Sequence, residues 1–211
     1  MKVSRERFTE HRQRILEAAG RLFREKGFDG IGVDGIMQEA GLTHGGFYGH
    51  FGSKADLAAQ ACAAALGRTA DKWEAMATGR SEDGLAEIVQ SYLSKRHRDD
   101  PGSGCIFAAL GGEVARQSDA VRTTVTQGVR AQLGILEKVV GGRSKAERRE
   151  QAVAALSELV GAMVVARLVD DPALSNEILT VAVGAVGGAS RGSQETSYAS
   201  RPQVGPDRGR Q

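Results

Sequence analysis

Cysteine, proline and aromatic residues are scarce in this chain of 211 residues, which contains 2 Cys and 4 Pro and is 5% aromatic. The two cysteines, Cys62 and Cys105, lie far apart in sequence, which excludes a disulfide-stabilised framework. The 4 His are scattered, and neither they nor the cysteines show metal-ligand spacing. The sequence therefore predicts no metal site and no cofactor.

An excess of one charge is also lacking, because 28 basic residues stand against 26 acidic ones. A generally cationic coat for nucleic acid is excluded, so any DNA binding has to come from a local patch. The first residues are charged and lack the apolar core of a signal peptide. No run approaches the roughly 18 consecutive apolar residues that a spanning helix needs. We expect a cytoplasmic protein with no membrane partner.

Alanine, leucine and valine are abundant and recur at helical spacing, which predicts an all-α fold with a substantial core. The first helix has a single apolar stripe that includes Ile15, Leu22 and Phe23, and Gly27 ends it. Ser81, Ser118 and Ser144 are predicted to begin later helices as caps. The predicted helices outside the central stretch span approximately residues 9–26, 53–77, 84–97, 105–116, 118–140, 144–169 and 173–186.

The stretch Val33–Phe51 predicts two short helices joined by a tight turn at Gly41. The Thr43 hydroxyl is expected to cap the second helix, on whose inner face Phe47 and Phe51 lie four residues apart. Two helices joined by a short Gly-containing turn describe a helix-turn-helix, whose second helix enters the DNA major groove. The apolar face of the first helix is formed by Ile36, Met37 and Ala40.

Basic residues flank this stretch. Residues 1–26 contain 8 basic and 4 acidic residues, a net charge of +4, which either marks a solvated helix face or brings Arg5, Arg7 and Arg12 near phosphates. Ser53, with Asp56 three residues on, predicts a capped helix start, and Lys54 then lies where the helix dipole prefers an anion. A phosphate opposite Lys54 would explain that cation; the alternative is an ordinary exposed lysine.

The last two helices carry more apolar surface than a small helical domain can cover. We interpret them as a dimer interface, with packing inside one chain as the alternative. From Gly187 the composition turns to Gly, Ser, Arg, Pro and Gln without periodicity, which predicts a disordered tail. The predicted organisation is a helix-turn-helix domain over 1–56, a helical effector-binding and dimerisation domain over 57–188, and a tail over 189–211.

Several residues outside the helix-turn-helix are candidates for effector binding, because such pockets are mostly apolar with few polar groups. Each of them has a plain structural alternative in the core. Arg167, within an apolar helix, pairs with an acid across the dimer, holds a ligand carboxylate, or lies exposed at the edge of the stripe. Cys105 follows a Gly-rich loop at a helix N-terminus, a setting that raises thiol reactivity, although a buried structural thiol is the alternative. The candidate effector residues are Trp73, Met76, Tyr92, Phe107, Met163 and Arg167.

The N-terminal stretch resembles the TetR family of bacterial transcriptional repressors. The resemblance covers residues 11–57 without insertion and is most specific in RILEAA, in LF and KGF, in I-x-x-x-A-G-L, and in F-Y-x-H-F-x-S-K-x-x-L. Beyond residue 60 it is one of architecture only. It implies an operator-binding homodimer whose C-terminal domain binds a small-molecule effector.

The resemblance also implies which residues contact DNA. Those expected to face the bases are Thr43, His44, Gly45 and Phe47, and those expected to face the phosphates are Tyr48, His50 and Lys54. Alternatives from the residues themselves are core positions for Phe47 and Tyr48 and a packed histidine at His50. Two departures stand out: Gly32 replaces a frequent Ser or Thr cap, and Gly45, Gly46 and Gly49 make the recognition helix unusually rich in glycine.

The hypothesis that follows is a ligand-responsive repressor that binds a palindromic double-stranded DNA operator. The alternatives are a DNA-binding dimer without a ligand, a redox or electrophile sensor acting through Cys105, and a small thiol enzyme. No base, nucleotide loop or metal set accompanies Cys105, so we predict that the chain is not an enzyme.

Overall fold

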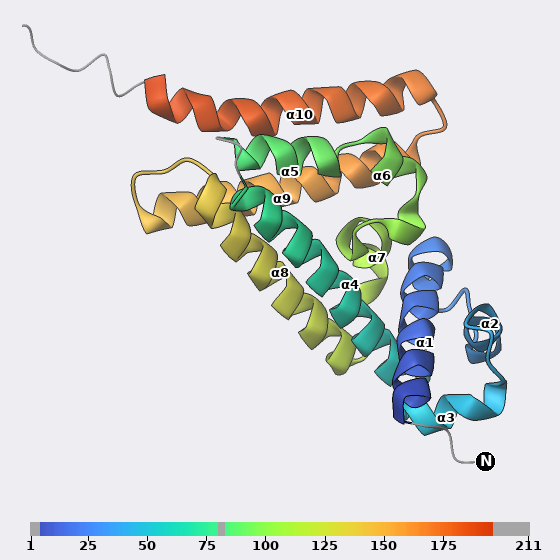
Figure 1. Ribbon diagram of the computed structural model, residues 1–211. Helices are drawn as coiled ribbons and strands as arrows, with labels where there is room; N and C mark the ends of the chain where they lie inside the picture. The colour runs from blue at the N-terminus through green and yellow to red at the C-terminus, as the bar shows by residue number, and fades with distance from the viewer. Residues whose placement is uncertain (1–4, 80–82, 196–211) are drawn as a thin grey trace, which may run out of the picture.

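The computed structural model describes residues 5–79 and 83–195, with side chains up to residue 187, and this part of the chain is all-α (Figure 1). Its helices follow one another around a common core, with the N-terminal helices at one end and the last helix across the other (Figure 1). The elements are α1 (Arg5–Lys26), α2 (Val33–Glu39), the 3-10 turn η1 (His44–Gly46), α3 (Phe47–His50), α4 (Lys54–Ala77), α5 (Gly84–Tyr92), α6 (Lys95–Asp99), the 3-10 turn η2 (Pro101–Ser103), α7 (Ile106–Val114), α8 (Asp119–Val139), α9 (Lys145–Leu168) and α10 (Pro172–Glu195).

The N-terminal helices form a small unit around α1. The apolar stripe predicted on α1 is buried, with Ile15 and Phe23 almost without exposure, and it packs against α2 and α4. Phe23 and Phe28 contact each other with ring centroids 5.3 Å apart, so the turn after α1 is also anchored in the core. Gly27, with φ +80°, ends α1 as predicted, because a left-handed residue there carries no steric penalty when it is glycine.

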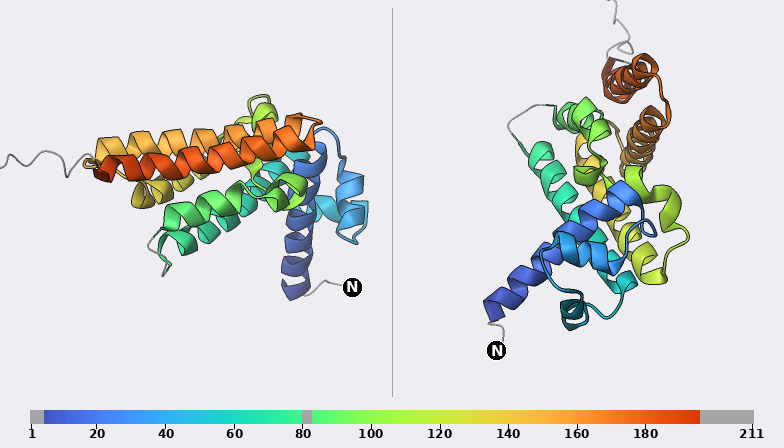
Figure 2. Two further views of the ribbon diagram at one scale, coloured as in Figure 1. Left: turned by 90° about the horizontal axis from the view of Figure 1, so that it is seen from above. Right: turned by 90° about the vertical axis from the view of Figure 1, so that its right-hand side faces the viewer.

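The C-terminal part consists of two long helix pairs. The helices α4 and α8 pack along each other, and α9 and α10 run side by side as a separate layer (Figure 2). The shorter α5, α6 and α7 lie between these pairs, and α7 contacts α1, α4, α8 and α9. This layered arrangement confirms the predicted fold class.

The predicted serine caps at the helix starts are only partly present in the structure. Ser144 accepts a hydrogen bond from the Glu147 backbone N–H and Glu147 reaches back, so the predicted capping box is present. Ser118 makes no side-chain cap, contrary to prediction. The predicted helix over 84–97 is two helices, because Ser94 caps a new one through its hydroxyl. Asp83 caps α5; Ser81 lies outside the described residues.

Two helix ends differ from the predictions at the termini. The first helix begins at Arg5, one turn before the predicted Thr9. The last helix continues to Glu195, beyond the predicted end near Val186, so the first residues of the predicted tail are helical. Residues 196–211 of that tail lie outside the described residues.

One helix, α9, is long and apolar enough to cross a membrane by length and composition alone, with a window of mean hydropathy 1.5. It packs against α10, α8 and α7, and 33% of that window is buried; the core helix of a soluble protein passes the same test of length and composition. The sequence contained no unbroken run of that length because Glu158 and Arg167 interrupt it.

Candidate nucleic-acid interface and effector cleft

The turn between α2 and the following helix has the geometry that a helix-turn-helix requires. Gly41 adopts φ +67°, its N–H donates to the Gln38 carbonyl, and the Leu42 N–H donates to the Met37 carbonyl. This pair of bonds is a Schellman motif, which satisfies the last carbonyls of α2 and reverses the chain in few residues. The prediction that Gly41 ends the first helix is confirmed.

The second helix of the motif is shorter than predicted. It begins as a 3-10 turn over His44–Gly46 and becomes α-helical only over Phe47–His50. The Thr43 hydroxyl forms no cap, contrary to prediction; the Thr43 carbonyl instead accepts the Gly46 N–H at 3.0 Å. Glycine disfavours the α-helix through its backbone entropy, so Gly45 and Gly46 account for the irregular start.

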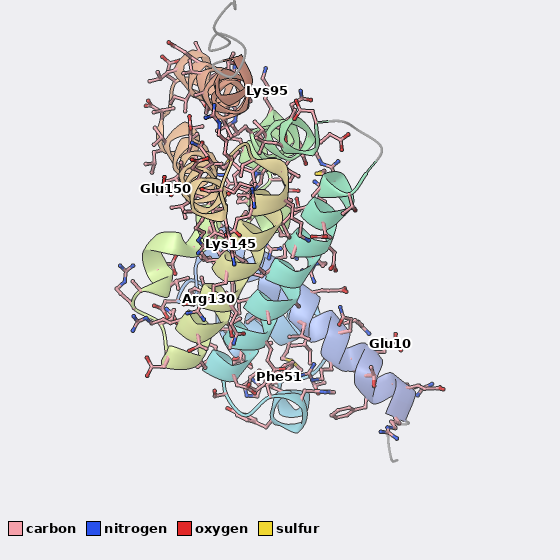
Figure 3. All side chains as sticks on the ribbon, turned by 90° about the vertical axis from the view of Figure 1, so that its left-hand side faces the viewer. Glu10, Phe51, Lys95, Arg130, Lys145 and Glu150 are labelled. Atoms are coloured by element: carbon pink, nitrogen blue, oxygen red, sulfur yellow. The ribbon has the colours of Figure 1, made fainter. Side chains whose placement is uncertain are left out.

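The side chains of this short helix divide between core and surface. Phe47 is 1% exposed and packs on Phe51, whose ring centroid lies 5.9 Å away, so the predicted base contact by Phe47 is wrong. Residues four apart share one helix face, and the next residue points away from it. Tyr48 is accordingly 68% exposed. Phe51, the first residue of the turn between α3 and α4, is 2% exposed (Figure 3).

The other residues expected to face the bases lie at the surface. Thr43, His44 and Gly45 are all exposed. The Nδ1 atom of His44 contacts the carboxylate of Asp34 on α2, and its ring lies 6.1 Å from that of Tyr48. Asp34 thereby orients His44 and leaves its Nε2 atom directed at other partners.

His50 has a mainly structural environment. Its ring stacks on Phe8 of α1 at 4.2 Å and lies 6.4 Å from His11. Burial, followed by the charges of His11 and Arg12, lowers the pKa of His50 below its ordinary value. A neutral imidazole contributes no cation to a phosphate contact, so the packed-histidine alternative describes this residue better.

Lys54 opens α4 at a well-capped helix terminus. The Ser53 hydroxyl accepts the Asp56 N–H at 3.0 Å, and the Asp56 carboxylate accepts the Gly52 N–H at 3.0 Å, so the predicted cap is present. Lys54 itself is partly exposed. Arg12 is engaged in packing, because it contacts Gln60 and lies over the Phe51 ring at 5.2 Å. The predicted phosphate cation that lies beside the recognition helix is therefore Lys54.

A cleft of about 670 Å³ lies between α1 and α4 on one side and the segment from α5 to the start of α7 on the other. Of the predicted effector residues, Trp73 and Tyr92 line it, with their rings edge to face at 5.8 Å. Phe107 and Met163 are buried in the core and Met76 is half-buried, and none of these three lines the cleft. Sequence reasoning missed its basic lining, which consists of Arg21, Arg24, Arg68, Lys72 and Arg96.

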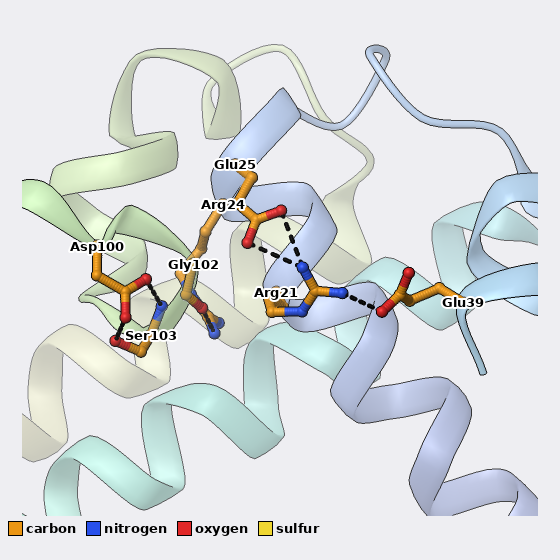
Figure 4. Close-up of polar contacts among 7 residues, drawn as sticks. All are labelled: Arg21, Arg24, Glu25, Glu39, Asp100, Gly102 and Ser103. Atoms are coloured by element: carbon orange, nitrogen blue, oxygen red, sulfur yellow. Dashed lines mark hydrogen bonds and ion pairs between the residues drawn. The ribbon is translucent and has the colours of Figure 1, made fainter.

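Two residues, the buried Arg24 and the half-buried His97, connect this cleft to neighbouring elements. Arg24 of α1 donates to the Gly102 carbonyl from Nε at 2.9 Å and also from Nη2 (Figure 4). His97 Nδ1 contacts the Tyr92 carbonyl at 2.6 Å, and His97 Nε2 accepts the Cys105 N–H at 2.9 Å. Since Nε2 accepts, Nδ1 carries the proton and the ring is neutral. Burial lowers the pKa of His97, which agrees with that assignment.

Within residues 5–79 and 83–195, no carboxylate forms an ion pair with Arg167. It donates to the backbone carbonyls of His97 and Arg98, the latter at 3.1 Å, and it does not line the cleft. The side chain thus ties α9 to the end of α6. Arg167 thus lies outside the basic cleft but beside a smaller pocket of about 270 Å³, and its role in effector binding stays a prediction.

Both thiols are buried. Cys105 is 4% exposed at the N-cap of α7, and burial raises its pKa despite the helix N-terminus. Burial also raises the pKa of Cys62 to about 11. Reactivity requires the thiolate. Cys105 is therefore a protonated, enclosed thiol, which favours the structural alternative.

The outer face of α9 and α10 carries exposed apolar side chains, which we call the apolar face. Leu168 is 75% exposed and Val181 is 63% exposed. The two helices lie side by side at the edge of the molecule, α9 packing also on α7 and α8 and α10 also on α5 (Figure 2). The apolar face comprises Val153, Val165, Leu168, Leu174 and Val181.

Comparison with known proteins agrees with this architecture. Residues 15–61 match the family model described as bacterial regulatory proteins, tetR family. The HTH-type transcriptional repressor AcnR of Corynebacterium glutamicum is 34% identical over 92 residues, which are 44% of this chain and 45% of AcnR. The repressor NemR of Escherichia coli is 25% identical over 137 residues, covering 63% of this chain and 69% of NemR. The matched segment thus spans about half the length of the first of these relatives.

Solved structures share the fold over almost the whole chain. The reduced form of E. coli NemR superposes with a TM-score of 0.74 at 22% identity, covering 85% of this chain and 96% of NemR. A TetR-family regulator from Agrobacterium tumefaciens gives 0.67 at 20% identity, covering 90% and 98%. The fold and motif define a helical protein with an N-terminal helix-turn-helix. Residues 15–61 carry the helix-turn-helix of the tetR family of bacterial regulatory proteins, as the sequence motifs indicated.

Proposed function

We propose that this chain is a transcriptional repressor that binds a palindromic DNA operator as a homodimer and is released by a small molecule. The observation that carries the proposal is the exposed surface formed by Thr43, His44, Gly45 and Tyr48 beside Lys54 at the start of α4. Helix-turn-helix proteins read base edges from the start of the second helix and anchor it through flanking phosphate contacts. The relatives AcnR and NemR are named repressors, which supports the same direction of regulation.

Glycines in the recognition element fit this use. A Cβ built on Gly45 or Gly49 meets no atom within 4 Å, so the fold does not demand glycine at either position. Because glycine has no side chain, the backbone at Gly45 and Gly49 is exposed and can approach the floor of the DNA major groove. Phe47 anchors the recognition element in the core, and His44 and Tyr48 are exposed on its outer side.

The apolar face of α9 and α10 is the proposed dimer interface. It is exposed in the single chain, and large exposed apolar patches mark interaction sites. A two-fold axis through it would present both recognition elements on one side of the dimer, with half-site centres about 34–36 Å apart or a multiple of that. We assign residues 1–56 to DNA binding and 57–188 to dimerisation and effector binding, and the proposed site of action is the cytoplasm.

Effector control requires contacts between the two parts, and α1 makes them. Arg24, in the last turn of α1, donates to the Gly102 carbonyl. The N–H of Phe28, just after α1, donates to the Glu113 carboxylate of α7 at 2.9 Å. The C-terminal end of α1 is therefore fixed to the C-terminal part at two points. Arg21 of α1 also contacts Glu39 of α2. A movement of η2 or α7 therefore shifts the helix-turn-helix. Such coupling is typically about 1–3 kcal/mol.

The alternative of a thiol sensor through Cys105 has one point in its favour, since the solved NemR structure is of a reduced form. The buried, protonated state of Cys105 in this chain stands against it. Replacing Cys105 with Ser separates the two: oxidant or electrophile should release the operator from the wild type alone if the thiol is the sensor. No catalytic function is proposed.

The test of the proposed function is selection of genomic DNA fragments by the purified protein, followed by band-shift assays of the selected fragments over a salt series. The expected result is enrichment of a palindromic site bound by a dimer with steep salt dependence. The selection is repeated after unfolding and refolding to remove any bound effector. Absence of an enriched site in both preparations at low salt would refute the proposal.

A further inference from the structure

The cleft between α1 and α4 is unusually basic for an effector site. Five cations line it, from α1, α4 and α6, against a single acid, Glu17. Arg21 is already paired with Glu25 and Glu39, and Lys72 donates to the Ser91 hydroxyl. Among the residues that the structure describes, no carboxylate pairs with the remaining three: Arg24, Arg68 and Arg96. Asp100, outside the lining, interacts with Arg24 and Arg96 without a close ion pair, so the cleft lining keeps an excess of positive charge.

Two buried donors in this cleft lack hydrogen-bond partners. Arg24 is 8% exposed; its Nε and Nη2 atoms donate to Gly102, and its Nη1 atom donates to nothing (Figure 4). Tyr92 is 4% exposed, and its hydroxyl makes no hydrogen bond of normal geometry and interacts only weakly with the Cys105 thiol. Buried polar groups are almost always hydrogen-bonded, so each such donor calls for a partner that the chain does not supply.

The electrostatics of Arg24 point in the same direction. Burial, and next the like charge of Arg68, lower the pKa of the Arg24 guanidinium. Burial raises the pKa of Tyr92 well above its usual range, so its hydroxyl keeps its proton and remains a donor. An acceptor that carries a negative charge would satisfy both groups and offset the repulsion between the two arginines.

We propose that this cleft binds an aromatic carboxylate, whose carboxylate is held by Arg24 and Arg68 and whose ring lies against Trp73. A guanidinium presents planar paired donors that match a carboxylate. The Tyr92 hydroxyl donates to the same oxygens, and the edge-to-face pair of Trp73 and Tyr92 forms the apolar wall. The volume of about 670 Å³ holds a ligand of one or two rings. This inference rests on the proposed function and names the class of its effector.

The cleft also gives the ligand a direct hold on the DNA-binding unit. Arg24 belongs to α1, and Gly102, to which it donates, belongs to η2 (Figure 4). A Cβ at Gly102 would lie 2.4 Å from a Glu25 carboxylate oxygen, so η2 and α1 are already in close contact. A carboxylate that draws on Arg24 changes this contact, and α1 carries the change to α2 through Arg21 and Glu39.

The experiment is isothermal titration calorimetry of the full-length protein with 2-naphthoate, with uncharged 2-naphthamide as the matched ligand. We expect 2-naphthoate to bind and 2-naphthamide to bind at least tenfold more weakly. Arg68→Gln should weaken 2-naphthoate binding about tenfold or more, as expected for loss of one charged hydrogen bond. Arg130→Gln, an exposed arginine on α8 outside the cleft, should not change it (Figure 3).

Several results would overturn the inference: no binding of 2-naphthoate up to millimolar concentration, equal binding of the amide, or an unchanged Kd in Arg68→Gln. Tighter binding of 2-naphthyl phosphate than of 2-naphthoate would reject a carboxylate as the ligand. Arg24→Gln is a second variant, which should also weaken 2-naphthoate binding. Because Arg24 is buried, this variant can fail to fold; Arg68 is exposed, so the test with Arg68→Gln stands in that case too.

The calorimetry contains no DNA, so 2-naphthoate binding can be measured whether or not the protein binds an operator. Specific operator binding without 2-naphthoate binding would refute the inferred effector class and leave the proposed function intact. Naphthoate binding that leaves the band-shift unchanged would keep the ligand site and reject its role in release.

Discussion

The clearest test of the recognition element compares two adjacent aromatic residues that the fold separates. Phe47 is 1% exposed and contacts Phe51, whereas Tyr48 is 68% exposed. Truncating a buried phenylalanine to alanine typically costs about 3–5 kcal/mol, from lost burial and the cavity left behind. Truncating an exposed side chain usually changes stability by less than about 0.5 kcal/mol. We therefore expect Phe47→Ala to destabilise the protein and Tyr48→Ala to leave it stable.

Thermal unfolding followed by circular dichroism measures the difference. For a chain of this size, 1 kcal/mol corresponds to about 2–4 °C in Tm, so Phe47→Ala should lower Tm by roughly 6–20 °C. Phe47→Leu, which keeps most of the buried volume, should recover much of that loss. Tyr48→Ala should keep the wild-type Tm within about 2 °C and weaken band-shifts on every DNA sequence alike, because a phosphate contact carries no sequence information.

The opposite pattern would refute this orientation of the recognition helix. If Phe47→Ala melted with the wild type but bound DNA with altered base preference, Phe47 would face the groove, as the family resemblance had implied. A large fall in Tm for Tyr48→Ala would place its ring in the core. Either result would mean that α3 is rotated relative to the structure described here.

Four further predictions address the remaining surfaces. Lys54→Ala should reduce the slope of log K against log salt by about one unit, because one phosphate contact is lost, in band-shifts over a salt series. His44→Ala should change which bases are preferred in a fragment selection, because Asp34 directs the ring outward. Val181→Glu should convert the dimer to a monomer in light scattering, because a charge at the centre of the apolar face is left unpaired. In His97→Asn the loss of Tm between pH 7.5 and pH 5.5 should be smaller than in the wild type.

The sign of the pH effect follows from the lowered pKa of His97. Below the ordinary histidine value of about 6.5 the unfolded chain binds a proton that the folded chain resists, so stability falls as pH falls through that value. His50, whose pKa is also lowered, retains its share in the variant. An identical decline in both proteins would exclude His97 as a contributor.

The other three predictions have equally direct counter-results. An unchanged salt slope would remove Lys54 from the phosphate contacts, and equal loss on every sequence would exclude base contact by His44. For the dimer, Ala63→Glu is the control, because Ala63 is exposed on α4 away from the apolar face. A dimer that persisted in Val181→Glu, or a monomer in Ala63→Glu, would reject the apolar face as the interface.

The local elements were readable from the sequence because their causes are local. Helical spacing of apolar residues placed the core of α1, and Gly41 ended α2 because only glycine enters the left-handed region there at no cost. The capping pairs at Ser53 and Ser144 were correct for the same reason. Ser118 failed because a serine at a helix start permits a side-chain cap without requiring one.

The binding surfaces were only partly readable. Periodicity already placed Phe47 beside Phe51 on the inner face, and the resemblance alone suggested a base contact for Phe47. Of the residues predicted to bind an effector, Trp73 and Tyr92 line the cleft, whereas Phe107 and Met163, equally plausible by type, lie in the core. An apolar residue has no sequence signal that separates a pocket wall from the interior.

The helical class and the helix-turn-helix could be recognised from the sequence because they depend on periodicity and on turn chemistry within a few residues, and the motifs over residues 11–57 added the family resemblance. That Arg24, Arg68 and Tyr92 share one cleft follows from the packing of distant segments. They come from α1, α4 and α5, and on its own each is an unremarkable residue on a helix. The excess positive charge and the unpaired donors arise only once folding buries Arg24 and Tyr92 beside Arg68, and that is a property of packing rather than of any segment.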